Sequence, residues 1–325
     1  MKRLIIITLG LFIFSCSKTR NPEKDTKIIY DKGIVEPFAP ELFSKLSNVR
    51  DFTITNDESE AYFTLQSHFR ELSVIMSIHK EDEKWQTPKI VEFSGKFSDL
   101  EPFLSPDGLK LFFVSNRPIS KDSTATKDYD IWYVERENFN SNWSAPINVG
   151  APINTNLDEF FPSITSSNNL YFTTIKENMN GQDDIFVSEW KNNVYSEPIA
   201  IDSAVNTKGA EFNAFVAPDE SFILFSGWRR KDGQGSGDLY ISQRKNGKWL
   251  PAKNLGKHIN SKYMEYCPYV NLETNTLYFT SRRSNIRLKD SGYVNLEELK
   301  KEINRFDNGT SRIYKTGFNI SIEKY

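Results

Sequence analysis

The chain has 325 residues, of which 38% are hydrophobic, 14% aromatic and 26% charged, and 41 basic against 43 acidic side chains give a formal net charge of −2. This apolar content supports a folded core and excludes a largely disordered chain, while the lack of a basic excess excludes a general nucleic-acid binder. The 24 Phe and 14 Tyr residues favour β-structure, because aromatic side chains suit the half-buried surface of a sheet.

The first residues have the pattern of a bacterial export signal. Two basic residues precede an apolar run, 4–14, that is too short to span a bilayer as a helix. The run leads to Cys16 in a sequence that resembles the lipobox of bacterial lipoproteins. We predict a signal peptide over 1–15, lipidation of Cys16 and a polar tether over 16–34; the alternative is an ordinary signal peptide with a chance cysteine. Only Cys267 then remains, so no internal disulfide is expected.

An internal repeat organises the rest of the chain. Five short segments align, and their last residues are 55, 105, 165, 217 and 271, about 54 residues apart on average. Each segment is followed by a turn rich in Asn, Asp or Pro, a second strand, a variable loop, a third strand and a fourth strand with an aromatic residue and a Pro. Four short strands per repeat are typical of a propeller blade. We therefore predict an all-β fold, a single five-bladed β-propeller over 35–325.

The fifth repeat lacks a fourth strand of its own. A segment near the N-terminus, 37–46, has a similar sequence to the fourth strands, so we predict that it completes the last blade and closes the ring without exposed edges. The last repeat also carries an insertion, 283–310. Its pattern predicts a short helix that Asn295 caps, and the position of the loop places this helix over part of the channel mouth.

The second repeat resembles a known family. Its segment 101–132 contains Ser105-Pro106-Asp107-Gly108 in the first turn and Asp130-Ile131-Trp132 in the third strand. This pattern resembles the TolB-like, WD-type propeller repeat of envelope lipoproteins from Bacteroidetes-type bacteria. The resemblance implies the propeller fold and an envelope location. It specifies no single activity, because such repeats serve as scaffolds, binding modules and enzyme appendages.

One face of the predicted disc carries a ring of acidic residues. The entry loops of four repeats have a carboxylate at the same register: Asp99, Glu159, Glu211 and Glu265. Such a ring could bind a cation, an amine or sugar hydroxyls at the mouth of the central channel. Alternatively, each carboxylate caps the backbone amides of its own entry turn.

Arginines open the long loops between second and third strands on the same face: Arg117, Arg229, Arg230, Arg282, Arg283 and Arg287. In one interpretation they pair with aspartates of the third strands, because the planar guanidinium suits bidentate contact with a carboxylate. In the other interpretation they form a mixed-charge mouth that recognises a peptide terminus or an acidic sugar.

Motifs for catalysis are scarce. The three His residues have no metal-binding spacing, no G-x-S-x-G elbow is present, and the cores of the predicted innermost strands carry no carboxylate. We therefore expect a lipid-anchored, non-catalytic propeller at the outer membrane, facing the periplasm, that binds a protein or glycan partner without a cofactor, a metal or nucleic acid. The alternative is a glycoside hydrolase or lyase that uses Glu159, Glu211 and Glu265.

Overall fold

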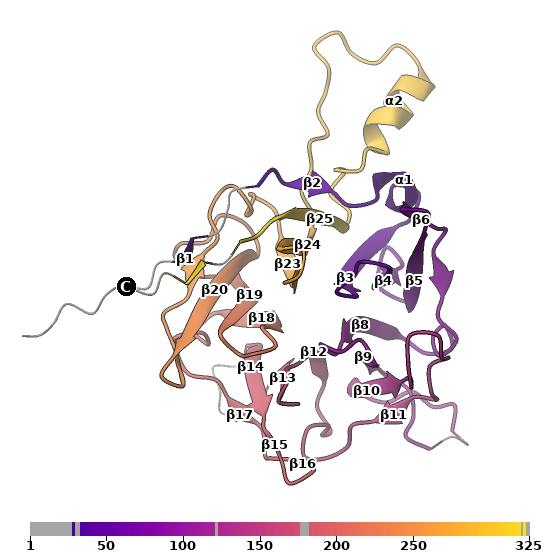
Figure 1. The fold of residues 1–325 in the computed structure, drawn as a ribbon. Helices are drawn as coiled ribbons and strands as arrows, with labels where there is room; N and C mark the ends of the chain where they lie inside the picture. The colour runs from indigo at the N-terminus through magenta and orange to yellow at the C-terminus, as the bar shows by residue number, and fades with distance from the viewer. Residues whose placement is uncertain (1–27, 30–32, 121–122, 176–181, 320, 323–325) are drawn as a thin grey trace, which may run out of the picture.

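The computed structural model describes residues 28–29, 33–120, 123–175, 182–319 and 321–322. Antiparallel sheets stand around a central channel as the five blades of a propeller (Figure 1). The predicted all-β, five-bladed fold is therefore confirmed. Within the described ranges, no helix is long and apolar enough to cross a bilayer.

In each blade the first strand lies innermost, next to the channel. The strands of blades 1 and 2 are β3 (Asn48–Ile54), β4 (Glu60–Gln66), β5 (Ser73–Glu81), β6 (Lys84–Trp85) and β7 (Lys89–Ile90), then β8 (Asp99–Leu104), β9 (Lys110–Ser115), β10 (Asp130–Glu135) and β11 (Ile147–Asn148). Blade 3 consists of β12 (Glu159–Ile164), β13 (Leu170–Thr174), β14 (Asp184–Ser188) and β17 (Ile199–Ala200), with an added hairpin of β15 (Trp190–Lys191) and β16 (Val194–Tyr195). Blade 4 consists of β18 (Ala210–Val216), β19 (Phe222–Trp228), β20 (Asp238–Lys245), β21 (Lys248–Trp249) and β22 (Lys253–Asn254).

The last blade is closed by the N-terminal strand, as predicted. It consists of β23 (Glu265–Asn271), β24 (Thr276–Ser281), β25 (Arg312–Gly317) and β2 (Glu36–Pro37), which pairs with β25. The closing strand is shorter than the predicted 37–46. Ala39 has a left-handed backbone with φ 43°, and Pro40 then begins the one-turn helix α1 (Pro40–Phe43), so the chain leaves the sheet after Pro37. A further pair, β1 (Ile28–Ile29) and β26 (Ser321–Ile322), joins part of the predicted tether to the C-terminal segment.

The predicted helix of the last repeat is present as α2 (Leu296–Ile303), and the Asn295 side chain accepts a hydrogen bond from the Glu298 N–H at 2.9 Å. Its predicted position was wrong. The helix projects outward from the ring beside blade 5 (Figure 1). The two ends of the insertion are joined beyond the strands by a bridge between Ser284 and Asn308, and this stem directs the helix away from the channel.

A bulge in every innermost strand shapes the channel. One residue per blade has a left-handed backbone, with φ between 47° and 57°, and the strand register shifts beside it: Asp51, Glu101, Phe161, Asn213 and Cys267. Such a bulge re-aims the side chains next to it. Below the bulges the channel is filled by aromatic rings of Phe103, Phe215 and Tyr269, whose centroids are 5.3 to 6.1 Å apart.

Candidate functional site

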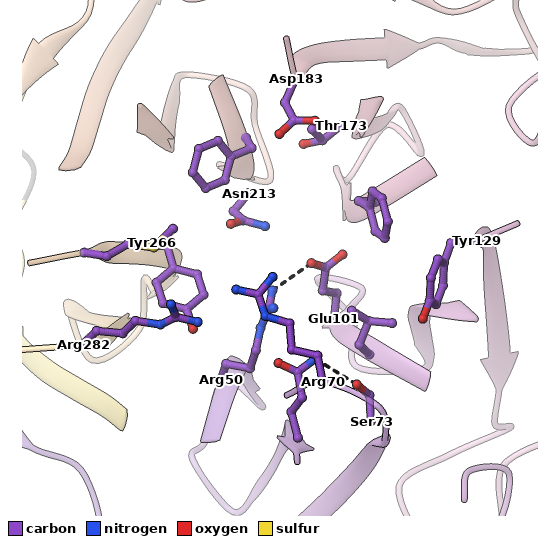
Figure 2. Close-up of a pocket in the computed structure, with 15 residues that line it drawn as sticks. Arg50, Arg70, Ser73, Glu101, Tyr129, Thr173, Asp183, Asn213, Tyr266 and Arg282 are labelled. Carbon is purple, nitrogen blue, oxygen red and sulfur yellow. Dashed lines mark hydrogen bonds and ion pairs between the residues drawn. The ribbon is translucent and has the colours of Figure 1, made fainter. Parts of the chain in front are cut away.

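A pocket of about 370 Å³ opens at one mouth of the central channel, where the loops between second and third strands lie. Its lining side chains converge from several blades (Figure 2). The residue just before each bulge contributes to the lining: Arg50, Leu100, Phe160, Phe212 and Tyr266. The bulges therefore build this pocket, and it combines aromatic walls with charged groups.

A buried ionic network forms the floor of the pocket. Arg50 contacts Asp51 at 2.7 Å and Glu101 at 3.0 Å, which joins blades 1 and 2. The other oxygen of Glu101 accepts a hydrogen bond from the Phe161 N–H of blade 3 at 2.7 Å. The Cys267 thiol of blade 5 donates to Asp51 at 2.8 Å. The network therefore links four of the five blades across the channel.

Burial changes the proton affinities of this network. Burial, together with the neighbouring Asp51 carboxylate, raises the pKa of Glu101 to about 8, against the opposing effect of Arg50. Burial also raises the pKa of the Cys267 thiol well above its usual value, with a further contribution from Asp51. Because the thiolate is the nucleophilic form, Cys267 is a structural hydrogen-bond donor here.

One hydroxyl at the pocket wall lacks the partner that two of its counterparts have. On β4 and β24, Thr64 and Thr280 each accept a hydrogen bond from the amide of the neighbouring blade's bulge residue, at 2.9 and 3.3 Å. Thr173 occupies the same register on β13, is 2% exposed and lines the pocket, but its hydroxyl has no partner in the described part of the chain. Ser226, at the same register of β19, is likewise buried without a partner among the described residues but does not line the pocket. A buried hydroxyl without a partner carries a free-energy penalty, which a bound polar group would remove.

The remaining polar groups divide the pocket into two sides. Asp183 lies beside Thr173, Arg70 and Arg282 approach from the opposite side, and the buried amide of Asn213 lies between these two groups (Figure 2). Arg282 donates through Nε to a serine hydroxyl at 3.2 Å, and neither arginine forms an ion pair with another described residue. Burial raises the pKa of Asp183. The pocket therefore presents cationic donors on one side and uncharged or acidic acceptors on the other.

The four predicted entry-loop carboxylates lie elsewhere. Asp99, Glu159, Glu211 and Glu265 are at most 1% exposed, and none of them lines the pocket. Glu159, Glu211 and Glu265 each accept the backbone N–H of the residue four positions earlier, at 3.2, 2.7 and 2.7 Å. Each also accepts that residue's hydroxyl, so the structure uses them to tie down the entry turns of their own blades. Burial raises the pKa of Glu159 to about 7.

Of the predicted loop arginines, Arg117, Arg229 and Arg283 also lie outside the pocket lining. Arg117 contacts Asp99 at 2.6 Å, and Arg283 contacts Glu265 at 3.4 Å, so both pair with entry-loop carboxylates of their own blades. Arg229 is exposed, and its guanidinium lies 3.9 Å from the ring centroid of the preceding tryptophan. The structure thus brings two of these three arginines together with two of the carboxylates.

Of the pocket residues, sequence reasoning pointed to Arg282 as one of the loop arginines and missed the others. Asp51 and Glu101 lie four residues before two of the aligned strand ends, in the same register as Phe161, Asn213 and Cys267. Regular alternation does not single out these positions, because the bulge is what turns them to the channel. Equal spacing from the strand ends was the one available signal. Among the described residues, no group of three His, Cys, Asp or Glu side chains could hold a metal ion.

No protein-family model matches the sequence, and no curated protein sequence matches it. The structure is similar to solved propellers. It aligns with the protein BT0996, solved as an RGII complex, at a TM-score of 0.54 and 7% identity, over 90% of the present sequence and 92% of the other. At that identity the likeness shows the fold alone.

Two further solved structures align at a TM-score of 0.48 and 11% identity. One is a protein proposed to be TolB, from Agrobacterium tumefaciens; the alignment covers 84% of the present sequence and 91% of that protein. The other is the α-L-arabinofuranosidase PaAbf62A from Podospora anserina in complex with cellotriose, over 90% and 97%. The names of these two proteins differ widely, and neither likeness assigns an activity to the disc.

Proposed function

We propose that this protein is a binding module whose channel-mouth pocket takes an acidic sugar unit of a glycan. The observation that carries the proposal is a pair of arginines, Arg70 and Arg282, that form no ion pair with another described residue and share one pocket with Asp183, Asn213 and the buried Thr173 hydroxyl, which has no partner among the described residues. A carboxylate fits the guanidinium groups, which donate in a planar fork. Sugar hydroxyls both donate and accept, so they suit the side with the threonine, carboxylate and amide.

The aromatic walls support a sugar as the ligand. Phe160, Phe212 and Tyr266 line the pocket beside its polar groups, and apolar ring faces combine with a few placed polar groups in small-molecule sites. The volume of about 370 Å³ suits a small ligand such as a sugar unit. A peptide that presents its C-terminal carboxylate is the rival ligand, since it offers the same anionic group.

Binding fits the pocket better than catalysis because only one carboxyl is free to react. A glycosidase requires two carboxyl groups beside the scissile bond. Both oxygens of Glu101 are occupied, one by Arg50 and one by the Phe161 N–H. This leaves Asp183 as the one carboxyl of the pocket lining without a hydrogen-bond partner among the described residues.

A glycoside hydrolase or lyase is the second candidate, and one observation favours it. Glu101 and Asp183 both line the pocket, and burial raises the pKa of each, as a general acid requires. Glu159, Glu211 and Glu265, the carboxylates that the sequence suggested for this role, would not be the ones used. Release of reducing ends from an acidic glycan, abolished in Asp183→Asn, would establish the enzyme over the binding module.

We further propose that the protein is anchored in the envelope through a lipid on Cys16, which lies outside the described residues. The described chain enters the disc through β2 at the rim of blade 5 (Figure 1). A lipid at the N-terminus would therefore hold the disc by its edge and leave the channel-mouth pocket accessible to a partner.

Calorimetric titration with carboxylated oligosaccharides tests the proposal. Trigalacturonate and sialyllactose would each be compared with their methyl esters, which keep the hydroxyls but lose the charge. We expect at least one acid to bind, and its ester to bind about tenfold more weakly, because a charge-assisted contact is lost. Arg282→Gln should weaken binding of the acid by a similar factor, whereas the exposed Arg229→Gln should not. Equal affinity for acid and ester, or binding only of peptides with a free C-terminus, would refute the acidic-sugar ligand.

A further inference from the structure

The grooves between neighbouring blades are filled by a recurring set of four side chains. Between blades 1 and 2 the set consists of Tyr62, Glu60, Arg136 and Trp143. Arg136 contacts Glu60 at 2.8 Å and lies 4.3 Å from the Trp143 ring centroid, while the Trp143 Nε1 donates to the Tyr62 hydroxyl at 2.9 Å. We call such a set of tyrosine, glutamate, cation and tryptophan the interblade quartet.

Two other interfaces contain the same four kinds of side chain. In these interfaces the glutamate comes from the first turn of the following blade, whereas Glu60 lies on β4 of the same blade as Tyr62. Between blades 5 and 1 it consists of Tyr278, Glu58, Lys80 and Trp85, and between blades 3 and 4 of Tyr171, Glu220, Arg244 and Trp249. The cation and the tryptophan are paired across a strand hairpin, as in Lys80 with Trp85. The charged groups of the quartet are thus neutralised within the groove, and the aromatic rings close it.

The interface between blades 2 and 3 has the same registers but different residues. Trp190 replaces the cation and pairs with Tyr195, which replaces the tryptophan. Phe112 replaces the tyrosine, and Asn168, with the same left-handed backbone as the glutamates Glu58 and Glu220, replaces the acid. The interface between blades 4 and 5 also lacks a cation, but there the register holds Phe318, which is 1% exposed and packed in the core.

The altered quartet leaves an open groove of about 440 Å³. Its rings are Phe112, Tyr133, Trp190 and Tyr195, and Trp190 and Tyr195 meet edge to face at a centroid distance of 4.7 Å. Asn168 and Asn193 also line the groove, and both are exposed, so their carboxamides are accessible to a ligand.

The groove offers no unpaired charged group among the described residues, so a neutral ligand fits it better than an ionic one. No carboxylate lines it, and its one cation, Lys110, is already paired with Glu135 at 3.5 Å and lies 5.1 Å from the Tyr133 ring centroid. Aromatic faces with exposed amides and no free charge match a neutral pyranose, whose C–H face packs on a ring and whose hydroxyls bind amides.

We propose that the groove between blades 2 and 3 is a second binding site, which takes a neutral sugar unit. It is separate from the channel-mouth pocket, since the two share no lining residue. A site for a neutral unit beside a site for an acidic one would let one disc hold two parts of a mixed glycan. The proposal stands on the groove alone and does not require the channel-mouth pocket to bind an acid.

Saturation-transfer NMR on the full-length protein tests this site with four neutral probes: cellotriose, xylotriose, mannotriose and chitotriose. We expect at least one of them to bind, and Trp190→Ala to weaken it about tenfold through loss of the stacking face. Phe139→Ala removes an exposed ring outside the groove and should leave the affinity unchanged. Arg282→Gln, in the channel-mouth pocket, should also leave it unchanged, which separates failure here from failure there.

A double variant tests the site without removing packing. Trp190→Arg with Asn168→Glu restores the cation and the acid of the interblade quartet. Glu58 and Glu220 have the same left-handed backbone as Asn168, so this position accepts glutamate. We expect this variant to fold and to lose neutral-sugar binding. If none of the four probes binds the wild-type protein, or if affinity survives in both Trp190 variants, the groove is not a sugar site. Preferential binding of a proline-rich peptide would overturn the assigned ligand class.

Discussion

Arg50 is the residue on which the floor of the channel-mouth pocket depends. Its guanidinium contacts two buried carboxyl groups, Asp51 at 1% and Glu101 at 4% exposure, and pairs with the Asp51 carboxylate at 2.7 Å. Charges removed from water need such a partner, because an unpaired buried charge is strongly destabilising. The pocket therefore owes its shape to an ion network that the fold must keep intact.

Replacing Arg50 with methionine should destabilise the protein by about 3 to 5 kcal/mol, since the buried Asp51 carboxylate would lose its cation and Glu101 would lose a hydrogen-bond donor. Urea unfolding followed by circular dichroism measures the change. Arg229→Met is the matched control, because this arginine is exposed, and it should alter stability by less than about 0.5 kcal/mol. A loss below about 1 kcal/mol for Arg50→Met would contradict the role assigned to the network.

Glu159 makes stability depend on pH. Burial raises its pKa in the folded protein from 4.5 to about 7, so folding favours the protonated form. The stabilising effect is complete below pH 4.5 and is lost as the pH rises through 7. Glutamine at position 159 cannot ionise. The melting temperature of Glu159→Gln, relative to that of the wild type, should therefore rise between pH 4.5 and pH 7. The exposed Glu297→Gln should follow the wild type; a parallel curve for Glu159→Gln would show that Glu159 does not titrate in this range.

At this scale the sequence predicted the carboxylate register but left its purpose open. Asp99, Glu159, Glu211 and Glu265 recur because each ties down the entry turn of its own blade, whereas blade 1 has Val49 at this register. Pocket residues do not repeat: the five bulge positions hold four different side-chain chemistries. Pattern recognition finds what recurs, whereas a ligand site depends on the positions that differ.

The closing strand of blade 5 shows how element boundaries follow local chemistry. Strand β2 was predicted from its place in the repeat, and the structure has it in that place. Its length could not be predicted, because the left-handed Ala39 and the helix that follows are set by packing of Phe38 and Phe43 into the core. The same holds for α2. The sequence predicted that Asn295 caps the helix, but it did not predict the direction in which the stem closed by Ser284 and Asn308 points.

Phe43→Ala should cost about 3 to 5 kcal/mol, because the ring is fully buried against Phe63 at a centroid distance of 4.9 Å. The variant removes the anchor behind the closing strand, so thermal unfolding should occur at a lower temperature. Phe69→Ala, at a ring that is 80% exposed, should have almost no effect. Equal melting temperatures for the two variants would mean that the segment around α1 does not hold the ring closed.

For the whole molecule, the repeat was sufficient to predict the architecture. A spacing of about 54 residues, five turn signals and one missing strand define a closed disc before any contact is known. The two proposed ligand sites lie where the fivefold pattern is broken, at the channel mouth and between blades 2 and 3. Neither could be predicted from the repeat, because the interblade quartet becomes visible only when side chains of neighbouring blades are seen together.

If the proposed lipid anchor is correct, attachment of the disc to the envelope depends on Cys16. Cys16→Ser should move the protein from the membrane fraction to the soluble fraction, because the lipid would have no attachment point. Fractionation followed by immunoblotting measures the distribution, and Cys267→Ser is the control, since that thiol is buried in the disc. Membrane retention of Cys16→Ser would refute the lipid anchor.

A crystal structure of the protein with a bound acidic oligosaccharide tests the central claim most directly. We predict that the sugar carboxylate lies within hydrogen-bond distance of the guanidinium groups of Arg70 and Arg282, with hydroxyls against Asp183 and Thr173. A carboxylate bound anywhere else on the disc, with the channel-mouth pocket empty, would contradict the account.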